Sequence, residues 1–336
     1  MITETIAKLV DGQSLSRGEA AGAMHELMSG EATPAQAAAF LVALRIKGET
    51  VEEIAGLASA MREKAEPVRA AGTLIDIVGT GGDGHGTLNI STAAAFVAAG
   101  AGLKVAKHGN RGMTSKSGSA DVLEALGVRI DLDPAGVAHS IDQSGFGFMF
   151  AQKYHPAMKH VAPVRRDIGI RTVFNVLGPL TNPARPAAHM IGAPSPVLAA
   201  KMAAALKLLG TSRGMVVSGA QGLDEIALHG PTTLFVVGPE GVSEQQVEPG
   251  MVGMTDAPLS EIAGGTPEEN AEMLRDIFAG MAGPRRDVVL LNAGAALFVG
   301  GLASSFEEGV ALARQTIERG KAREALDRAV AVSKTA

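Results

Sequence analysis

The chain has 336 residues, of which 46% are hydrophobic and 19% are charged, and its formal net charge is −5. This composition is typical of a globular protein with a substantial core, and the negative balance gives the chain as a whole no basic footprint for nucleic acid. Because the sequence contains no cysteine, disulfides, thiolate metal sites and cysteine nucleophiles are excluded.

The first residues of the chain do not predict a signal peptide. Residues 1–10 include Glu4 and Lys8 and lack the apolar core of a signal peptide. Elsewhere the longest apolar stretches, such as 93–102, fall far short of the roughly 20 residues that span a bilayer. We therefore expect a cytoplasmic protein with neither a membrane nor a nucleic acid as its partner.

Residues 1–66 contain only helical patterns. The capping-box spacing, in which a hydroxyl residue precedes Glu or Gln by three positions, occurs in Ser16 with Glu19, Thr33 with Gln36 and Thr50 with Glu53. Apolar residues recur after these caps at three- and four-residue intervals, as they do on one face of a helix. We predict a small all-helical domain over residues 1–70.

After Pro67, short apolar runs typical of buried strands alternate with helical patterns. The expected strands are 74–78, 103–106, 146–150, 213–218 and 232–237, and the expected helices include 91–99, 197–209 and 267–278. This alternation predicts a large α/β domain over residues 71–336, with a mainly parallel central sheet, hinged to the helical domain. The stretch 156–178 has a helical pattern between strands, and we expect residues from about 156 to 182 to contribute to the helical domain.

A glycine-rich stretch, 79–84, follows the expected strand at 74–78. Its glycines match the dinucleotide fingerprint, but no acidic residue lies about 20 positions further on, and the chain lacks a Walker A motif. The N–H groups of such a loop, beside a helix start that carries Ser91 and Thr92, suit a phosphate or diphosphate. Taken alone, the loop is explained equally well as an ordinary turn with Ser91 as a helix cap.

The stretch 107–121 follows the next expected strand. It gathers three cations, a histidine, an asparagine and four hydroxyl residues in a segment broken by glycines. A surface loop could have this composition, but so many phosphate-binding groups between a strand end and a helix favour a polyanion site.

Two further patterns are weaker when taken separately. Asp224 and Glu225 are adjacent carboxylates of the kind that binds Mg²⁺ together with substrate phosphates, although most such pairs are solvated surface. His155 and Arg165 are ten residues apart, nearly three helical turns, so on a continuous helix they lie near one face. The alternative is a surface helix with a basic end.

These motifs together closely resemble the anthranilate phosphoribosyltransferase family. The matching runs, in family order, are DIVGTGGD at 76–83, NIST at 89–92, KHGNR at 107–111, SKSGSAD at 115–121, FNVLGPLTNP at 174–183 and GLDE at 222–225. The resemblance covers essentially the whole chain and implies the fold of the nucleoside phosphorylase-like phosphoribosyltransferases. In that fold a small α domain is joined to a large α/β domain.

The resemblance also implies substrates and site residues. The donor is 5-phosphoribosyl 1-diphosphate, bound at positions that match Gly79, Gly82, Asp83, Thr87, Asn89, Ile90, Ser91, Thr92, Lys107, Ser115 and Ser119. Ser91 and Glu225 match the ligands of one Mg²⁺, and Asp224 with Glu225 those of a second. Positions along the anthranilate channel match His108, Asn110, His155, Arg165 and Gly178. The segment 112–114 departs from the small, Ser-rich residues often found there.

The implied reaction transfers the phosphoribosyl group to the amine of anthranilate in tryptophan biosynthesis. It gives N-(5-phosphoribosyl)anthranilate and diphosphate. The implied catalytic residues are Lys107 at the diphosphate, Arg165 at the acceptor carboxylate, and His108 as a late proton acceptor. The resemblance further implies a homodimer formed through the helical domain.

Two alternatives stay open from the sequence. Pyrimidine nucleoside phosphorylase shares the two-domain architecture, but the KHGNR run and the Asp224–Glu225 pair are not features of that enzyme. A related protein that binds nucleic acid and has lost transferase activity is expected to have a basic surface, whereas this chain has a net charge of −5.

Overall fold

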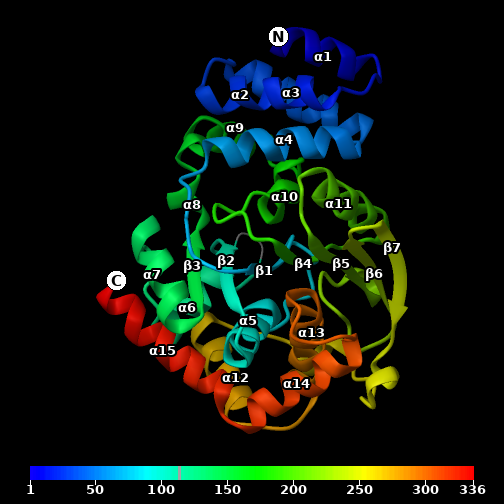
Figure 1. Cartoon of the computed structure of the whole chain (residues 1–336). Helices are drawn as coiled ribbons and strands as arrows, with labels where there is room; N and C mark the ends of the chain where they lie inside the picture. The colour runs from blue at the N-terminus through cyan, green and yellow to red at the C-terminus, as the bar shows by residue number, and fades with distance from the viewer. Residues whose placement is uncertain (113–114) are drawn as a thin grey trace.

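The structure, a computed structural model, describes residues 1–112 and 115–336 (Figure 1). A layer of helices from the N-terminal part of the chain lies over one face of a central sheet, and the C-terminal helices cover the other face. Met113 and Thr114, and with them the uncertain contacts of the segment 112–114, lie outside the described residues.

The helical layer is formed by α1 (Ile2–Val10), α2 (Arg17–Ser29), α3 (Pro34–Lys47) and α4 (Val51–Lys64). The capping boxes expected at the starts of α2, α3 and α4 are all formed. In each box a hydroxyl accepts from the third helical N–H, and the acidic or amide side chain at that position accepts from the cap N–H, so two otherwise unpaired donors are satisfied.

In the described part of the chain, seven strands form one sheet in the order β3-β2-β1-β4-β5-β6-β7. They are β1 (Leu74–Gly79), β2 (Lys104–Gly109), β3 (Phe146–Phe150), β4 (Ala188–Gly192), β5 (Arg213–Gly219), β6 (Thr232–Gly238) and β7 (Gly241–Val247). The pairs from β3 through β5 are parallel, and β6 and β7 are antiparallel, which confirms a mainly parallel sheet. The expected strands are present, but β4 and β7 were not expected from the sequence.

The remaining helices pack on the faces of the sheet or against other helices. They are α5 (Ile90–Ala101), α6 (Ser119–Leu126), α7 (Pro134–Ser144), α8 (Ala151–Tyr154), α9 (Ala162–Ile168), α10 (Phe174–Leu177), α11 (Pro196–Leu208), α12 (Pro267–Phe278), α13 (Pro284–Gly300), α14 (Phe306–Glu318) and α15 (Lys321–Thr335). One core joins α5 and α13 to the sheet, where Phe96 stacks on Phe146. A second core joins α4 and α11 to the opposite face.

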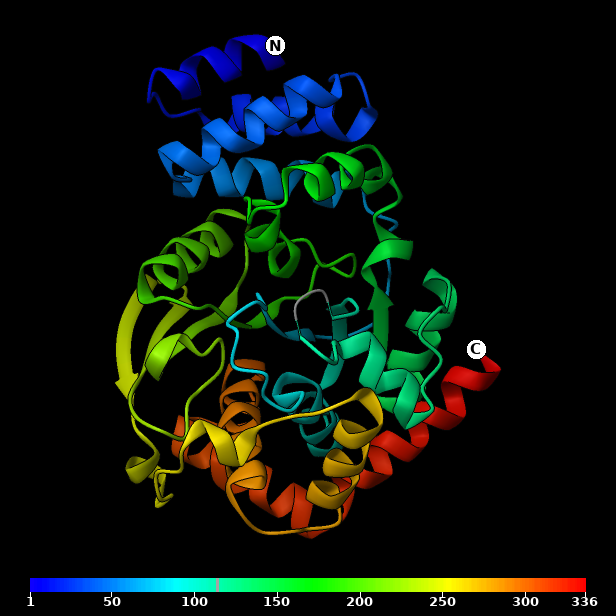
Figure 2. The same ribbon diagram turned by 180° about the vertical axis from the view of Figure 1, so that it is seen from behind.

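The stretch 156–178 is helical in part, as expected, but it is divided into short pieces. It consists of a 3₁₀ turn at Pro156–His160 followed by the short helices α9 and α10, and Gly169 ends α9 with φ of +66°. The argument that His155 and Arg165 share a helical face therefore fails, because ten-residue spacing defines a face only on a continuous helix. Apolar side chains of this stretch nevertheless pack in one core with α1–α4. Figure 2 shows the stretch crossing to the helical layer.

Candidate active site

The expected site loops meet at one edge of the sheet. The chain leaves β1, β2 and β5 at their carboxyl ends, and because these strands are parallel the three following loops emerge together. From β1 the chain proceeds to β2 and β3 on one side, and then returns to β4 on the other side. Such a reversal of strand order opens a crevice outside the strand ends, where ligands of α/β proteins bind.

Two glycines allow the Asp224 segment to lie across this edge. Gly79 and Gly192 are paired in register at the ends of β1 and β4. A Cβ at Gly192 would lie 1.4 Å from the Asp224 carbonyl oxygen, and one at Gly79 would lie 2.5 Å from Asp224 Oδ2. Any larger residue would therefore displace Asp224. The glycine loop, residues 79–84, also holds Asp224 in place, because the Gly81 N–H donates to Asp224 Oδ2 at 2.6 Å.

Two buried carboxylates lie at this point, and a third is close enough to repel them. Asp224 and Glu225 are each only 8% exposed, and Asp83 lies beside them. Burial and then the charge of Asp83 raise the pKa of Asp224 to about 6. Burial and then the charge of Asp224 raise the pKa of Glu225 well above its ordinary value. The carboxylates thus repel one another in a buried setting, and a bound cation would relieve the repulsion.

The carboxylates do not form a complete metal cage. Within residues 1–112 and 115–336, no three His, Cys, Asp or Glu side chains are gathered as a metal-binding group. Mg²⁺ commonly uses one or two carboxylates and takes its remaining ligands from water and substrate phosphates. Asp224 and Glu225 fit this mode, since they offer two carboxylate ligands.

Lys107, on β2, is buried beside the carboxylates and is 1% exposed. Its ammonium group donates to the Ile77 carbonyl oxygen and, at 3.2 Å, to Ser91 Oγ at the start of α5. Burial lowers the pKa of Lys107, while the nearby charges of Asp76 and Glu225 oppose that shift. Lys107 therefore supplies buried positive charge between two carboxylates and orients the Ser91 hydroxyl.

The other residues of the NIST motif, predicted to bind the phosphoribosyl donor, differ in their hydrogen bonds and burial. The amide of Asn89 is held by the protein, donating to the Ser117 carbonyl oxygen at 3.2 Å and accepting from Asn270 at 2.8 Å. Ile90 and Thr92 are buried, and the Thr92 hydroxyl makes no hydrogen bond with the described residues. Their side chains therefore belong to the buried core at the start of α5. Thr87 lies at an isolated bridge to Ala263.

The loop after β2 presents fewer free cations than its composition suggested. Arg111 pairs with Asp121 at 2.9 Å and with Glu124. The Ser119 hydroxyl donates to the Asn110 carbonyl oxygen at 3.3 Å, and Ser115 Oγ donates to a backbone oxygen two residues on. Arg111 therefore braces the loop through these ion pairs, and Lys107 is the cation of this stretch that lies beside Ser91.

A buried pair of histidines lies on the other side of the site. The rings of His108 and His155 are 5.0 Å apart, and each residue is 4% exposed. Burial, the largest cause in both cases, lowers the pKa of His108 to about 3 and that of His155 to about 4. The backbone of Gly178 lies beside His108. Both rings are therefore neutral at pH 7, and His108 Nε2 and both ring nitrogens of His155 make no hydrogen bond with the described residues.

His155 gives a testable pH dependence. Its pKa is about 6.5 when unfolded and about 4 when folded, so between these values the unfolded chain binds more protons. The stabilisation is complete above pH 6.5 and is lost as the pH falls towards 4. We expect His155→Gln to remove up to roughly 3 kcal/mol of this pH-dependent part. Urea unfolding at several pH values measures it, with His139→Gln on the exposed side of α7 as control. An unchanged slope in His155→Gln would contradict the prediction.

Arg165 is half-buried on α9, with its guanidinium 5.0 Å from the centre of the Phe174 ring. Burial lowers its pKa, and within the described residues it has no ion-pair partner. An aromatic face on one side leaves the guanidinium edge available for a carboxylate.

Comparison with known proteins decides the family. Residues 3–65 match the helical bundle domain of the glycosyl transferase family, and residues 71–323 match its a/b domain. Anthranilate phosphoribosyltransferase of Chloroflexus aggregans is 55% identical over 99% of this chain and 98% of its own length. The chain belongs to the anthranilate phosphoribosyltransferase family.

Solved structures of the family have the same fold. The enzyme of Thermus thermophilus is 49% identical, with a TM-score of 0.93 over 98% of this chain and 99% of its own. The Saccharomyces cerevisiae enzyme in complex with PRPP and Mg is 30% identical, with a TM-score of 0.92 over 100% and 98% of the two chains. The same yeast enzyme in complex with 4-fluoroanthranilate has a TM-score of 0.89. The fold class, the enzyme class and the family reaction expected from the sequence are confirmed.

Family motifs also contain residues that the sequence analysis left without a role. Asn182 donates to Asp76 Oδ2 at 2.7 Å and to the Ala106 carbonyl oxygen at 2.8 Å. The other oxygen of Asp76 accepts from the His108 N–H at 3.3 Å. This buried pair fixes the strand that carries Lys107 and His108. Its only signal in the sequence was that both residues lie within the matched runs.

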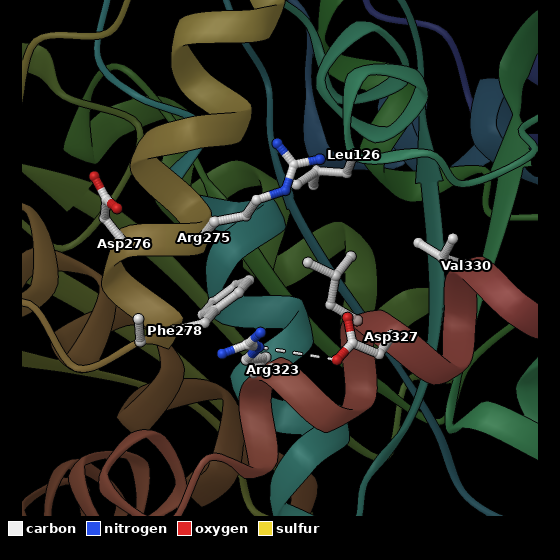
Figure 3. A pocket seen from close by; sticks show the side chains of 9 residues that line it. Leu126, Arg275, Asp276, Phe278, Arg323, Asp327 and Val330 are labelled. Atoms are coloured by element: carbon white, nitrogen blue, oxygen red, sulfur yellow. Dashed lines mark ion pairs between the residues drawn. The ribbon is translucent and has the colours of Figure 1, made fainter.

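A separate hollow of about 480 Å³ lies between α6, α12 and α15 (Figure 3). Arg323 and Asp327 face each other there at 4.0 Å, and Arg275 donates to the Ala125 carbonyl oxygen. None of the predicted site residues line it. In the described part of the chain, no helix is both long and apolar enough to cross a membrane.

Proposed function

We propose that this chain transfers the phosphoribosyl group of 5-phosphoribosyl 1-diphosphate (PRPP) to the amine of anthranilate, giving N-(5-phosphoribosyl)anthranilate and diphosphate. The observation that carries the proposal is the meeting of the glycine loop with Asp224, Glu225 and Lys107 at the switch point of a family fold. Loss of anthranilate fluorescence in the presence of PRPP and Mg²⁺ tests it. Phosphorolysis of a pyrimidine nucleoside at a comparable rate would favour the other enzyme class.

The donor site combines the glycine loop, the start of α5 and the carboxylate pair. We assign two Mg²⁺ ions, one to Ser91 and Glu225 and the other to Asp224 and Glu225. The fit rests on two buried carboxylates with raised pKa values and on the absence of a complete protein cage among the described residues. When bound, Mg²⁺ supplies positive charge to the leaving diphosphate. The loop residues Gly79, Gly82 and Asp83 line the same space.

Lys107 contributes to PRPP binding from its buried position beside Ser91. Its ammonium group is fully buried and already donates to Ser91 Oγ. It therefore acts on the diphosphate through electrostatic attraction and by orienting the Ser91 hydroxyl. Fixed charge of this kind stabilises a developing anion without reorganisation during the reaction.

The acceptor site lies along Arg165, His108, His155, Gly178 and Asn110. Arg165 is proposed to bind the anthranilate carboxylate in a fork and to aim the amine at C1 of the ribose. Attack forms the C1–N bond as the bond from C1 to diphosphate breaks. The amine nitrogen then carries an acidic proton, which the neutral His108 accepts at Nε2, an atom without a hydrogen bond among the described residues.

We assign residues 1–70 to the helical domain, with a contribution from about 156–182, and residues 71–336 to the α/β domain. The family models, which match residues 3–65 and 71–323, support the boundary, and the packing of Val161, Val164 and Phe174 in one core with α1–α4 supports the added contribution. A cytoplasmic location remains a prediction from the sequence.

A homodimer through the helical domain is also proposed. This layer exposes Val10 and Ile46, which are 70% and 81% accessible in the single chain. Light scattering at micromolar concentration is expected to give twice the mass of the chain, and Ile46→Glu to shift it towards the monomer. Val197→Glu, at a similarly exposed position on α11, is the matched control and should leave the dimer intact. A monomeric parent would contradict the proposal.

A further inference from the structure

The glycine loop is held from two opposite sides. On one side, the Gly81 N–H donates to Asp224 Oδ2 at 2.6 Å. On the other, Arg171 donates through Nη2 to the Gly81 carbonyl oxygen at 3.1 Å and through Nη1 to the Gly82 carbonyl oxygen at 2.9 Å. Arg171 lies between α9 and α10, six residues after Arg165. One guanidinium thus connects the acceptor-binding segment to the donor loop.

This contact decides where the loop N–H groups point. In a trans peptide the N–H points opposite to the carbonyl of the same unit. Because Arg171 binds the carbonyls of two consecutive units, the N–H groups of Gly82 and Asp83 are both turned away from it. Neither donates to any protein acceptor in the described part of the chain. Successive free N–H groups on one side form a site for anionic oxygens.

The conformation requires both glycines and the fork of an arginine. Gly81 and Gly82 have φ of +71° and +73°, a region that other residues rarely adopt. A Cβ at Gly82 would lie 1.9 Å from Arg171 Nη1, so a side chain there would displace the guanidinium. A lysine at 171 offers one point charge in place of two parallel donors and cannot hold both carbonyls in the same way.

We propose that Arg171 is a positioning residue, which holds residues 79–84 with the N–H groups of Gly82 and Asp83 directed at the diphosphate of the donor. The proposal rests on the proposed function. In this proposal Arg171 acts on the substrate through the loop, whose two carbonyl oxygens accept one N–H from each of its terminal nitrogens, and not by direct contact. Its loss therefore weakens donor binding and leaves the acceptor contact of Arg165 in place.

Calorimetric binding of PRPP with Mg²⁺, without anthranilate, tests this directly. Arg171→Met is expected to raise the Kd for PRPP at least about tenfold, as for the loss of an ordered anion site. The KM for anthranilate is expected to stay within about twofold. Arg171→Lys should recover only part of the loss. Arg166→Met, an exposed residue on α9 without a side-chain hydrogen bond in the described structure, is the matched control.

Millisecond hydrogen exchange of the donor-free protein gives a second measurement, independent of turnover. Arg171→Met is expected to speed exchange of the Gly81 amide, because the loop loses one of its two anchors, while the melting temperature stays close to that of the parent. A parent-like Kd for PRPP, full rescue by lysine, or equal weakening of both substrates would overturn the proposal. A parent that fails to consume anthranilate would instead refute the proposed function, and the exchange comparison would still decide the role of Arg171.

Discussion

Replacing Asp224 by Asn together with Glu225 by Gln is expected to lower turnover at least about a thousandfold, which corresponds to roughly 4 kcal/mol of transition-state stabilisation. Both side chains keep their shape but lose the charge that binds Mg²⁺ around the leaving diphosphate. The fold is expected to persist, because the change removes repulsion between buried carboxylates whose pKa values are raised by their surroundings. Steady-state kinetics at saturating Mg²⁺, with thermal melting in parallel, measures both effects.

The matched control is Glu268→Gln with Glu272→Gln, two exposed carboxylates on α12. It removes the same formal charge and should leave kinetics unchanged. Activity of the Asp224 and Glu225 double variant within a few-fold of the parent would show that the pair does not bind the essential metal. A large drop in its melting temperature would show that the carboxylates serve the fold.

Arg165→Ala is expected to raise the KM for anthranilate at least about tenfold and to leave the KM for PRPP nearly unchanged. The lost contact is a charge-assisted fork, worth more than the roughly 1 kcal/mol of a neutral hydrogen bond. Turnover should also fall somewhat, because a loosely held amine loses its line of attack on C1. Steady-state kinetics with each substrate varied in turn measures the two KM values. A variant with a raised KM for PRPP and an unchanged KM for anthranilate would reverse our assignment of the two sites.

Lys107→Ala is expected to show the opposite selectivity, with the larger loss for PRPP. Because Lys107 is buried between Asp76 and Glu225, its removal also leaves carboxylates without a counter-charge, at a cost of roughly 3–5 kcal/mol of stability. Adding Asp76→Asn to this variant should restore part of that stability but not the affinity for PRPP. Restoration of both would show that Lys107 acts only on the fold.

Most of the helical layer and the order of the motifs could be predicted from the sequence. The capping boxes at Ser16, Thr33 and Thr50 formed because a cap involves residues only three positions apart. The strand before the glycine loop was marked by a short apolar run. Strands β4 and β7 were missed for different reasons. His189 interrupts the apolar run of β4, and β7 is an edge strand whose side chains between Gly241 and Val247 are mostly exposed.

The segment 156–178 shows where local pattern misleads. Its pattern predicted helix without marking the breaks. Gly169 adopts a left-handed conformation and ends α9, so that Arg171 lies beyond the helix and reaches the glycine loop. The helical-face argument for His155 and Arg165 failed with it. His155 instead contacts His108, and Arg165 packs on Phe174.

The sequence by itself determined the helical caps, the two classes of domain and the family motifs, since each depends on residues that are neighbours in the chain. Only the tertiary structure decided which motifs share a site. Asp224 reaches Gly81 across 143 positions, and Asn182 reaches Asp76 across 106. Contacts over such separations follow from strand order, since β1 lies between β2 and β4 and brings the carboxyl ends of distant strands together. No local pattern encodes that order, because it is selected by the packing of the whole sheet between its helical layers.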